Sequence, residues 1–193
     1  MSSADALRTL ARIFAQPLAA EEVETLASAD HVLSRALRED GAHGGPTPLG
    51  ETLAEEFTRL FEGPVGRHPP FAGLACGDDE FLGPRARELI EAYRGADLEP
   101  DPTSGLLPDH LSVELDFVAT LLERGQAKDA AEFVARHMAN WVPAWIDGVG
   151  AATGMEFYRV AGSLLQEAIQ DLREPGLLRD EGASLGRDGH RRS

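Results

Sequence analysis

The chain has 193 residues, of which 33 are acidic and 18 are lysine or arginine, so its formal net charge is −15. This charge repels nucleic acid and anionic membranes, which excludes both as the main ligand, whereas it would attract a cationic partner. The alternative is that the charge serves solubility alone. The length allows a sizeable core, and we expect one domain, with two small lobes as the alternative arrangement.

The single cysteine, Cys76, excludes an internal disulfide and favours a reducing compartment. The sequence contains no run of roughly 18 apolar residues that could span a membrane. Its N-terminus lacks the basic-then-apolar order of a secretion signal. We therefore expect a soluble cytoplasmic protein.

The first part of the chain predicts short helices. Apolar residues recur at helical spacing over 3–14, 21–28 and 30–39. Thr47 followed by Pro48 is typical of a cap and a first helical turn. The helix that they open should bury a stripe of five apolar residues, Leu49, Leu53, Phe57, Leu60 and Phe61.

A loop rich in proline and glycine follows over 63–73. Gly63 and Pro64 should end the preceding helix, because glycine accepts a left-handed C-terminal conformation and proline cannot continue a helix. The adjoining pair Pro69–Pro70 restricts φ and should hold an extended segment. This segment would present Phe71 in a fixed direction.

Pro84 should open another helix, which Gly95 ends. The next segment, 96–107, is rich in Asp, Pro and Gly, and we interpret it as a linker. Its length is compatible with a hinge between two helical lobes, or with a point of domain exchange. We therefore expect the monomer and a domain-swapped dimer to be close in free energy.

The widest apolar face of the sequence belongs to a helix that should begin after Pro108 and Asp109. The Asp109 carboxylate is expected to accept hydrogen bonds from the first-turn N–H groups. His110 and Glu114 lie on one row of this helix, and buried polar groups need partners, so we look for function there. Six apolar residues predict a central helix with neighbours on several sides: Leu111, Leu115, Phe117, Val118, Leu121 and Leu122.

The C-terminal part predicts three further helices. One runs over 127–140, Pro143 restarts it until glycines at 148–150, and the last covers 155–172. Residues 174–193 have little to bury and are expected to be disordered. No alternating run of β-branched residues occurs, so we predict an all-α fold of about eight helices. The residues of 127–141 expected to point inward are Phe133, Val134, His137, Met138 and Trp141.

Motifs of common enzymes are absent. The sequence has no phosphate-binding glycine loop, no paired cysteines, no nucleophile elbow and no zinc-protease motif. The nearest candidate for a metal site is the pair His110 and Glu114, with His137 as a third ligand. The alternative is an i, i+4 polar pair whose members satisfy each other.

Three segments together resemble the TorD/DmsD family of cytoplasmic maturation chaperones for molybdenum oxidoreductases. They are FTRLFEGP at 57–64, PPF at 69–71 and PDHLSVELDF at 108–117. Weaker support comes from HMANWVPAW at 137–145 and from the aromatic pair at 157–158. The resemblance covers residues 50–170 in the order that the family shows.

The resemblance implies an all-helical protein of TorD-like fold that has no catalytic turnover and no cofactor of its own. Such chaperones bind the twin-arginine signal peptide and the apo form of a molybdoenzyme until the cofactor is inserted and export is allowed. On this basis Asp109 and Glu114 would supply negative charge and His110 a hydrogen bond. Phe61, Phe71 and Trp141 would form an apolar wall, and Pro69, Pro70, Gly63 and Pro64 would shape the loop.

Each assignment has a structural alternative. Asp109 can be only a helix cap, and Glu114 a structural carboxylate with internal partners. Phe61 and Trp141 can be core residues. Phe71, on a loop restricted by two prolines, is the aromatic most expected to be exposed for binding.

The sequence also departs from the family pattern. After the Pro-Pro-aromatic element the family often continues Glu-Ser-x-Tyr, whereas this chain has Ala-Gly-Leu-Ala at 72–75, and Asp116 replaces a usual Glu. Two rival functions remain at this point. One is a helical metal-dependent enzyme, and the other is the related group of nitrate reductase assembly factors, against which the Pro-Asp-His-Leu run weighs.

Overall fold

The computed structural model describes most of the chain as α-helix. Over the described residues it contains ten α-helices and no β-strand, which confirms the all-α prediction. The expected disordered tail at 174–193 lies outside the described residues. The structure describes residues 2–29, 31–43, 45, 47–62, 66–100 and 102–173.

Four helices form the N-terminal part of the fold. The first begins with a capping box, in which the side chains of Ser2 and Asp5 accept from each other's backbone N–H groups. The fourth has Pro48 at its N-cap position without a side-chain bond, so the expected Thr47 cap is wrong by one residue. The four are α1 (Ser3–Ala15), α2 (Ala20–Ser28), α3 (Val32–His43) and α4 (Leu49–Phe61).

The second part of the fold adds six α-helices, a 3₁₀ turn and a π-helical turn. The sequence prediction missed the short helix α5. It also ended the ninth helix too early, because that helix continues past the glycines at 148–150. The elements are α5 (Ala72–Ala75), α6 (Pro84–Gly95), η2 (Pro102–Ser104), α7 (Leu111–Glu123), α8 (Ala127–Phe133), η3 (Val134–Met138), α9 (Val142–Ala152) and α10 (Glu156–Arg173).

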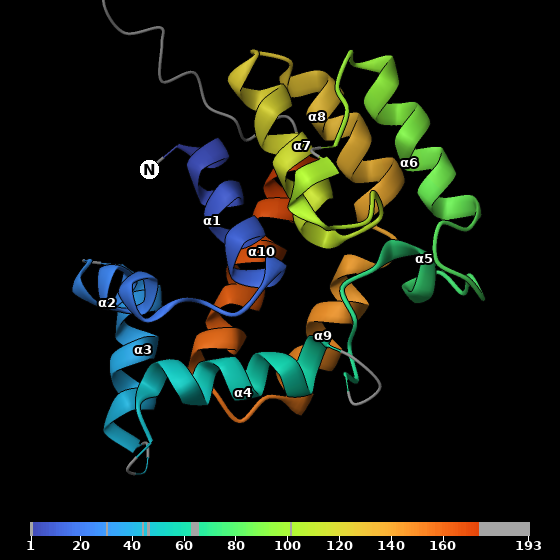
Figure 1. The fold of residues 1–193 in the computed structure, drawn as a ribbon. Helices are drawn as coiled ribbons and strands as arrows, with labels where there is room; N and C mark the ends of the chain where they lie inside the picture. Colours follow the sequence, from blue (N-terminus) through green and yellow to red (C-terminus); the bar gives the residue numbers. More distant parts are fainter. Residues whose placement is uncertain are drawn as a thin grey trace, which may run out of the picture.

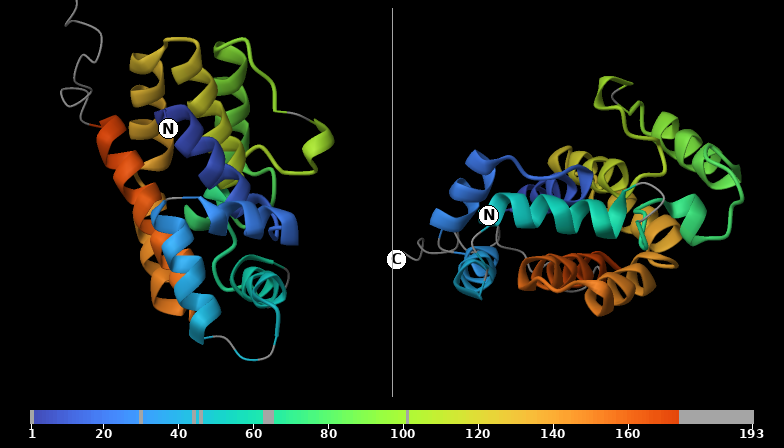
Figure 2. Two further views of the ribbon diagram at one scale, coloured as in Figure 1. Left: turned by 90° about the vertical axis from the view of Figure 1, so that its left-hand side faces the viewer. Right: turned by 60° about the horizontal axis from the view of Figure 1, so that its bottom comes forward.

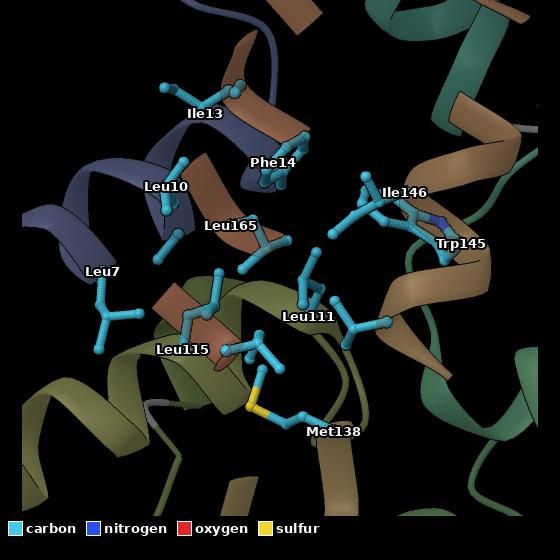
Figure 3. Packing of buried hydrophobic residues seen from close by; sticks show 14 of the residues in the cluster. Leu7, Leu10, Ile13, Phe14, Leu111, Leu115, Met138, Trp145, Ile146 and Leu165 are labelled. Atoms are coloured by element: carbon cyan, nitrogen blue, oxygen red, sulfur yellow. The ribbon is translucent and has the colours of Figure 1, made fainter. Parts of the chain in front are cut away.

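Helix α7 lies at the centre of the core, as the sequence predicts. Leu111, Leu115 and Val118 are fully buried. Helix α1 packs against both α7 and α10 (Figures 1 and 2). Leu122 is only half-buried, so its expected place near the centre is wrong. Figure 3 shows side chains of α1, α7, α9 and α10 meeting in this core, among them Leu7, Leu10, Phe14, Leu111, Leu115, Trp145 and Leu165.

The segment 96–107, predicted as a linker, contains the single 3₁₀ turn η2 in its described part. Ala96, at its start, and Pro108, directly after its end, accept hydrogen bonds from side chains of the neighbouring helices. Tyr93 Oη donates to the Pro108 carbonyl at 2.8 Å. Arg124 Nη1 donates to the Ala96 carbonyl at 3.1 Å. The exchange between a monomer and a domain-swapped dimer stays a prediction.

None of the helices that the structure describes is long and apolar enough to cross a membrane.

Candidate functional site

Two of the segments singled out in the sequence meet at the start of α7. Phe71 and His110 form an isolated antiparallel bridge. The amide that follows each of them donates to the carbonyl that precedes the other, at 2.8 Å in both cases. The two rings also touch edge to face, with centroids 5.0 Å apart. The Pro69–Pro70 segment is therefore fixed to the first turn of the central helix.

His110, and not Asp109, caps this helix. The Nδ1 atom of His110 accepts from the Ser112 amide at 3.1 Å. Burial lowers the pKa of His110 to about 4, so its ring is neutral at pH 7. The Asp109 carboxylate instead points towards α5, where its Oδ2 accepts from the Gly73 amide at 3.2 Å. The expectation that Asp109 caps α7 is therefore wrong, because its side chain is engaged across the bridge.

Glu114 is completely buried, and neither of its carboxyl oxygens has a hydrogen-bond partner among the described residues. Burial raises its pKa well above the usual value, although the nearby Arg85 opposes the shift. Burial therefore favours the protonated form of Glu114 over the ionised form. Burial likewise raises the pKa of Asp109, against the effect of the Gly73 amide. Both carboxyl groups are buried in this conformation, and their role as negative charges for a ligand stays a prediction.

Arg85, at the start of α6, completes the polar surroundings of Glu114. Its side chain is 11% exposed. Its guanidinium donates from Nη2 to the His137 carbonyl at 2.5 Å and from Nη1 to Glu88 at 2.9 Å. Burial, assisted by Arg85, lowers the pKa of His137 to about 4. A buried polar cluster thus joins α6, α7 and η3.

This cluster is not arranged as a metal site. Nδ1 of His110 already accepts from a backbone amide. The described ranges contain no group of three or more His, Cys, Asp or Glu side chains placed to hold an ion. His110, Glu114 and His137 therefore do not come together as the metal-enzyme hypothesis requires.

The predicted apolar wall is only partly a surface. Phe61 is 4% exposed and Trp141 2% exposed, so both belong to the core in this conformation. The Phe61 ring stacks on Trp145, with centroids 5.6 Å apart. Phe71 is half-buried, so part of its surface is exposed. Gly63 and Pro64 lie outside the described residues.

The sequence analysis missed a second aromatic element beside Phe71. Phe81 and Leu82 are 58% and 47% exposed, and they are the large apolar side chains that stand out on the described surface. The Phe81 ring meets Phe71 edge to face at 5.5 Å. The sequence does contain a signal for this exposed pair. In DDEFLG at 78–83, two apolar residues lie between acidic residues and a glycine.

Residues 14–147 match the family model described as nitrate reductase delta subunit. The chain belongs to this family. The nitrate reductase delta subunit family consists of assembly chaperones for molybdoenzymes, and it includes the TorD/DmsD type of maturation protein. No curated protein sequence matches the chain.

Membership of the nitrate reductase delta subunit family removes the need to choose between two of the functions considered in the sequence analysis. The TorD/DmsD interpretation and the nitrate reductase assembly interpretation, kept apart in the sequence analysis, are two forms of one family. The Pro-Asp-His-Leu run at 108–111 supplies the bridge and cap at the start of α7. In this family member, the same run therefore organises the place where α5, α6 and α7 meet.

Proposed function

We propose that this protein is a cytoplasmic chaperone for a molybdenum-cofactor oxidoreductase. It binds the twin-arginine leader peptide and the apo form of the catalytic subunit during cofactor insertion and before export. Family membership supports the general role. The observation that carries the proposed site is the Phe71–His110 junction, where a half-exposed aromatic ring is fixed by two prolines and by the first turn of α7.

A leader peptide of this class has paired arginines followed by an apolar stretch, so a binding protein needs an apolar surface and negative charge. Phe71 supplies part of the apolar surface. Its orientation is preset by the backbone bridge, so little conformational freedom is lost on binding. The net charge of −15 attracts the cationic part.

Asp109 and Glu114 act indirectly in this proposal. Asp109 holds the start of α5 through the Gly73 amide, and Glu114 is fully buried in the first turn of α7. Both keep their place in the site as residues that position Phe71 and His110. The arginines of the leader must then meet exposed carboxylates at the surface.

The proposal is tested by calorimetric titration of a synthetic leader peptide, with paired arginines and a following apolar stretch, into the wild type and Phe71→Ala. We expect Phe71→Ala to weaken binding about tenfold, since it removes an aromatic contact. Leu164→Ala serves as a control, because it removes a half-buried side chain from α10. The affinity should fall as salt rises and level off at a residual apolar contribution.

A wild type that ignores the peptide, or a Phe71→Ala variant that binds like wild type, would contradict this site. Size-exclusion chromatography over a wide concentration range tests the related proposal that the segment 96–107 permits a domain-swapped dimer. A single species at every concentration would argue against exchange.

A further inference from the structure

The turn between α5 and α6 exposes two large apolar side chains at the edge of the molecule. Phe81 and Leu82 are 58% and 47% exposed. Figure 1 and the right view of Figure 2 place this turn at the periphery, beyond α5. Leu82 has φ of +58°, a backbone conformation that non-glycine residues rarely adopt. Strain and exposed apolar area both oppose stability, so neither is explained by folding.

The turn is held by internal contacts at both ends. Asp78 N donates to the Gly73 carbonyl at 2.8 Å. The Asp78 Oδ2 atom accepts from the Arg85 amide at 3.1 Å. A Cβ atom at Gly83 would lie 2.7 Å from the same oxygen, so a larger residue there would push the Asp78 carboxylate out of place. Phe81 and Leu82 are thus presented on a preset support.

The exposed pair continues the surface proposed above. The rings of Phe81 and Phe71 touch at 5.5 Å, and those of Phe71 and His110 at 5.0 Å. The three rings form a row from the periphery to the buried start of α7. We call Phe71, Phe81 and Leu82 the aromatic platform.

The charge beside the platform is negative. Asp79 and Glu80, both exposed, precede Phe81 directly, and the turn 77–83 contains no basic residue. A second copy of the chain would bring these carboxylates and a net charge of −15 against an equal charge, which disfavours self-association. A cationic segment that continues into an apolar segment fits both features.

We infer that the platform binds the apolar stretch of the leader peptide through Phe81 and Leu82, while Asp79 and Glu80 attract its basic residues. This inference rests on the proposed function, because it assumes that the protein binds a leader peptide. It names the surface that contacts the apolar stretch of that peptide. It adds to the Phe71 site a contact that does not depend on the buried acids.

The test uses two synthetic peptides, one with paired arginines and the following apolar stretch, and one shortened before that stretch. Each is titrated into wild type, Phe81→Ser/Leu82→Ser and Asp79→Asn/Glu80→Gln, with circular dichroism to verify folding. The serine variant should bind the long peptide at least about tenfold more weakly and the short peptide like wild type. The amide variant should weaken both at low salt, with a difference that disappears at high salt.

The outcomes separate this inference from the proposed function. Wild type that binds the long peptide, with a serine variant that binds it equally well, overturns the inference alone. Wild type that binds neither peptide overturns both.

Discussion

The start of helix α7 and the part that follows it both bury side chains, but these side chains differ in chemistry. Towards its C-terminus, Leu115, Val118 and Leu121 pack among apolar side chains of the core. At its N-terminus, Asp109, His110, Ser112 and Glu114 are also buried. Four of their side-chain atoms have no hydrogen-bond partner in the part of the chain that the structure describes: Asp109 Oδ1, Ser112 Oγ and both oxygens of Glu114.

This difference separates the part of α7 that stabilises the fold from the part that we propose to support binding. Burial of apolar side chains is the main favourable term in folding, so the C-terminal half holds the domain together. Buried polar atoms without partners oppose folding by a few kcal/mol each at most. Their presence beside the half-buried Phe71 supports the binding role that we propose for the N-terminal end.

The largest expected effect concerns the apolar end. Leu115→Ala should lower the free energy of unfolding by about 2–5 kcal/mol, because a fully buried leucine leaves a cavity. The half-buried Leu122 on the same helix provides the matched control, and Leu122→Ala should cost clearly less. Urea denaturation measures both. Equal losses of unfolding free energy in the two variants would show that Leu115 is no more deeply buried than Leu122, which would contradict the central position of α7.

A methyl group added at Gly73 probes the contact between the bridge and α5. Its Cβ would lie 2.8 Å from Asp109 Oδ2 and 3.1 Å from Asp78 Oδ2. Gly73→Ala should therefore cost about 1–3 kcal/mol through overpacking. Gly150→Ala is the control, because its Cβ meets nothing within 4 Å and helix α9 should gain slightly. Thermal melts that rank the two variants in the opposite order would refute the packing.

Glu114 should make stability depend on pH. Its folded pKa lies above the ordinary value of 4.5, so the folded state favours the protonated form. The stabilisation is fully present below pH 4.5 and is lost as the pH rises towards the folded pKa. Glu114→Gln removes this loss, and the variant should gain on wild type by about 1.4 kcal/mol per pH unit from pH 4.5 up to the folded pKa, above which the difference stays constant.

Urea midpoints between pH 4 and pH 8 measure this difference. His110 has the opposite effect on the pH dependence. Because its folded pKa is lowered, the protein loses stability as the pH falls below 6.5, and this loss is the same in wild type and Glu114→Gln. A constant difference across the whole range would mean that Glu114 is ionised in the fold.

The smallest effect concerns the helix cap. His110→Ala removes the acceptor for the Ser112 amide and should cost about 1 kcal/mol. His110→Asn keeps a capping side chain and should recover most of that loss. Thermal melts of the two variants measure the difference, and an Asn variant no more stable than Ala would show that the cap contributes little.

The interpretation of the site depended on contacts between distant segments. The Pro-Asp-His-Leu run correctly located the start of α7, and the structure places the Pro-Pro-Phe segment beside it, as expected. Which of Asp109 and His110 caps the helix was not predictable, because Asp109 is drawn away by the Gly73 amide, 36 positions earlier. The exposure of Phe81 and Leu82 was also missed, since a short apolar pair has no periodicity to interpret.

The sequence by itself determined that the chain is helical, where most helices lie, and that α7 is central. The reason is that helical periodicity and turn residues are local properties, and a wide apolar face can be buried only at a centre. Only the tertiary structure decided that Glu114 is buried with no hydrogen-bond partner among the described residues, and that Phe81 faces solvent. Burial and charge state depend on which surfaces α5 and α6 bring to α7, and no spacing along the chain specifies that.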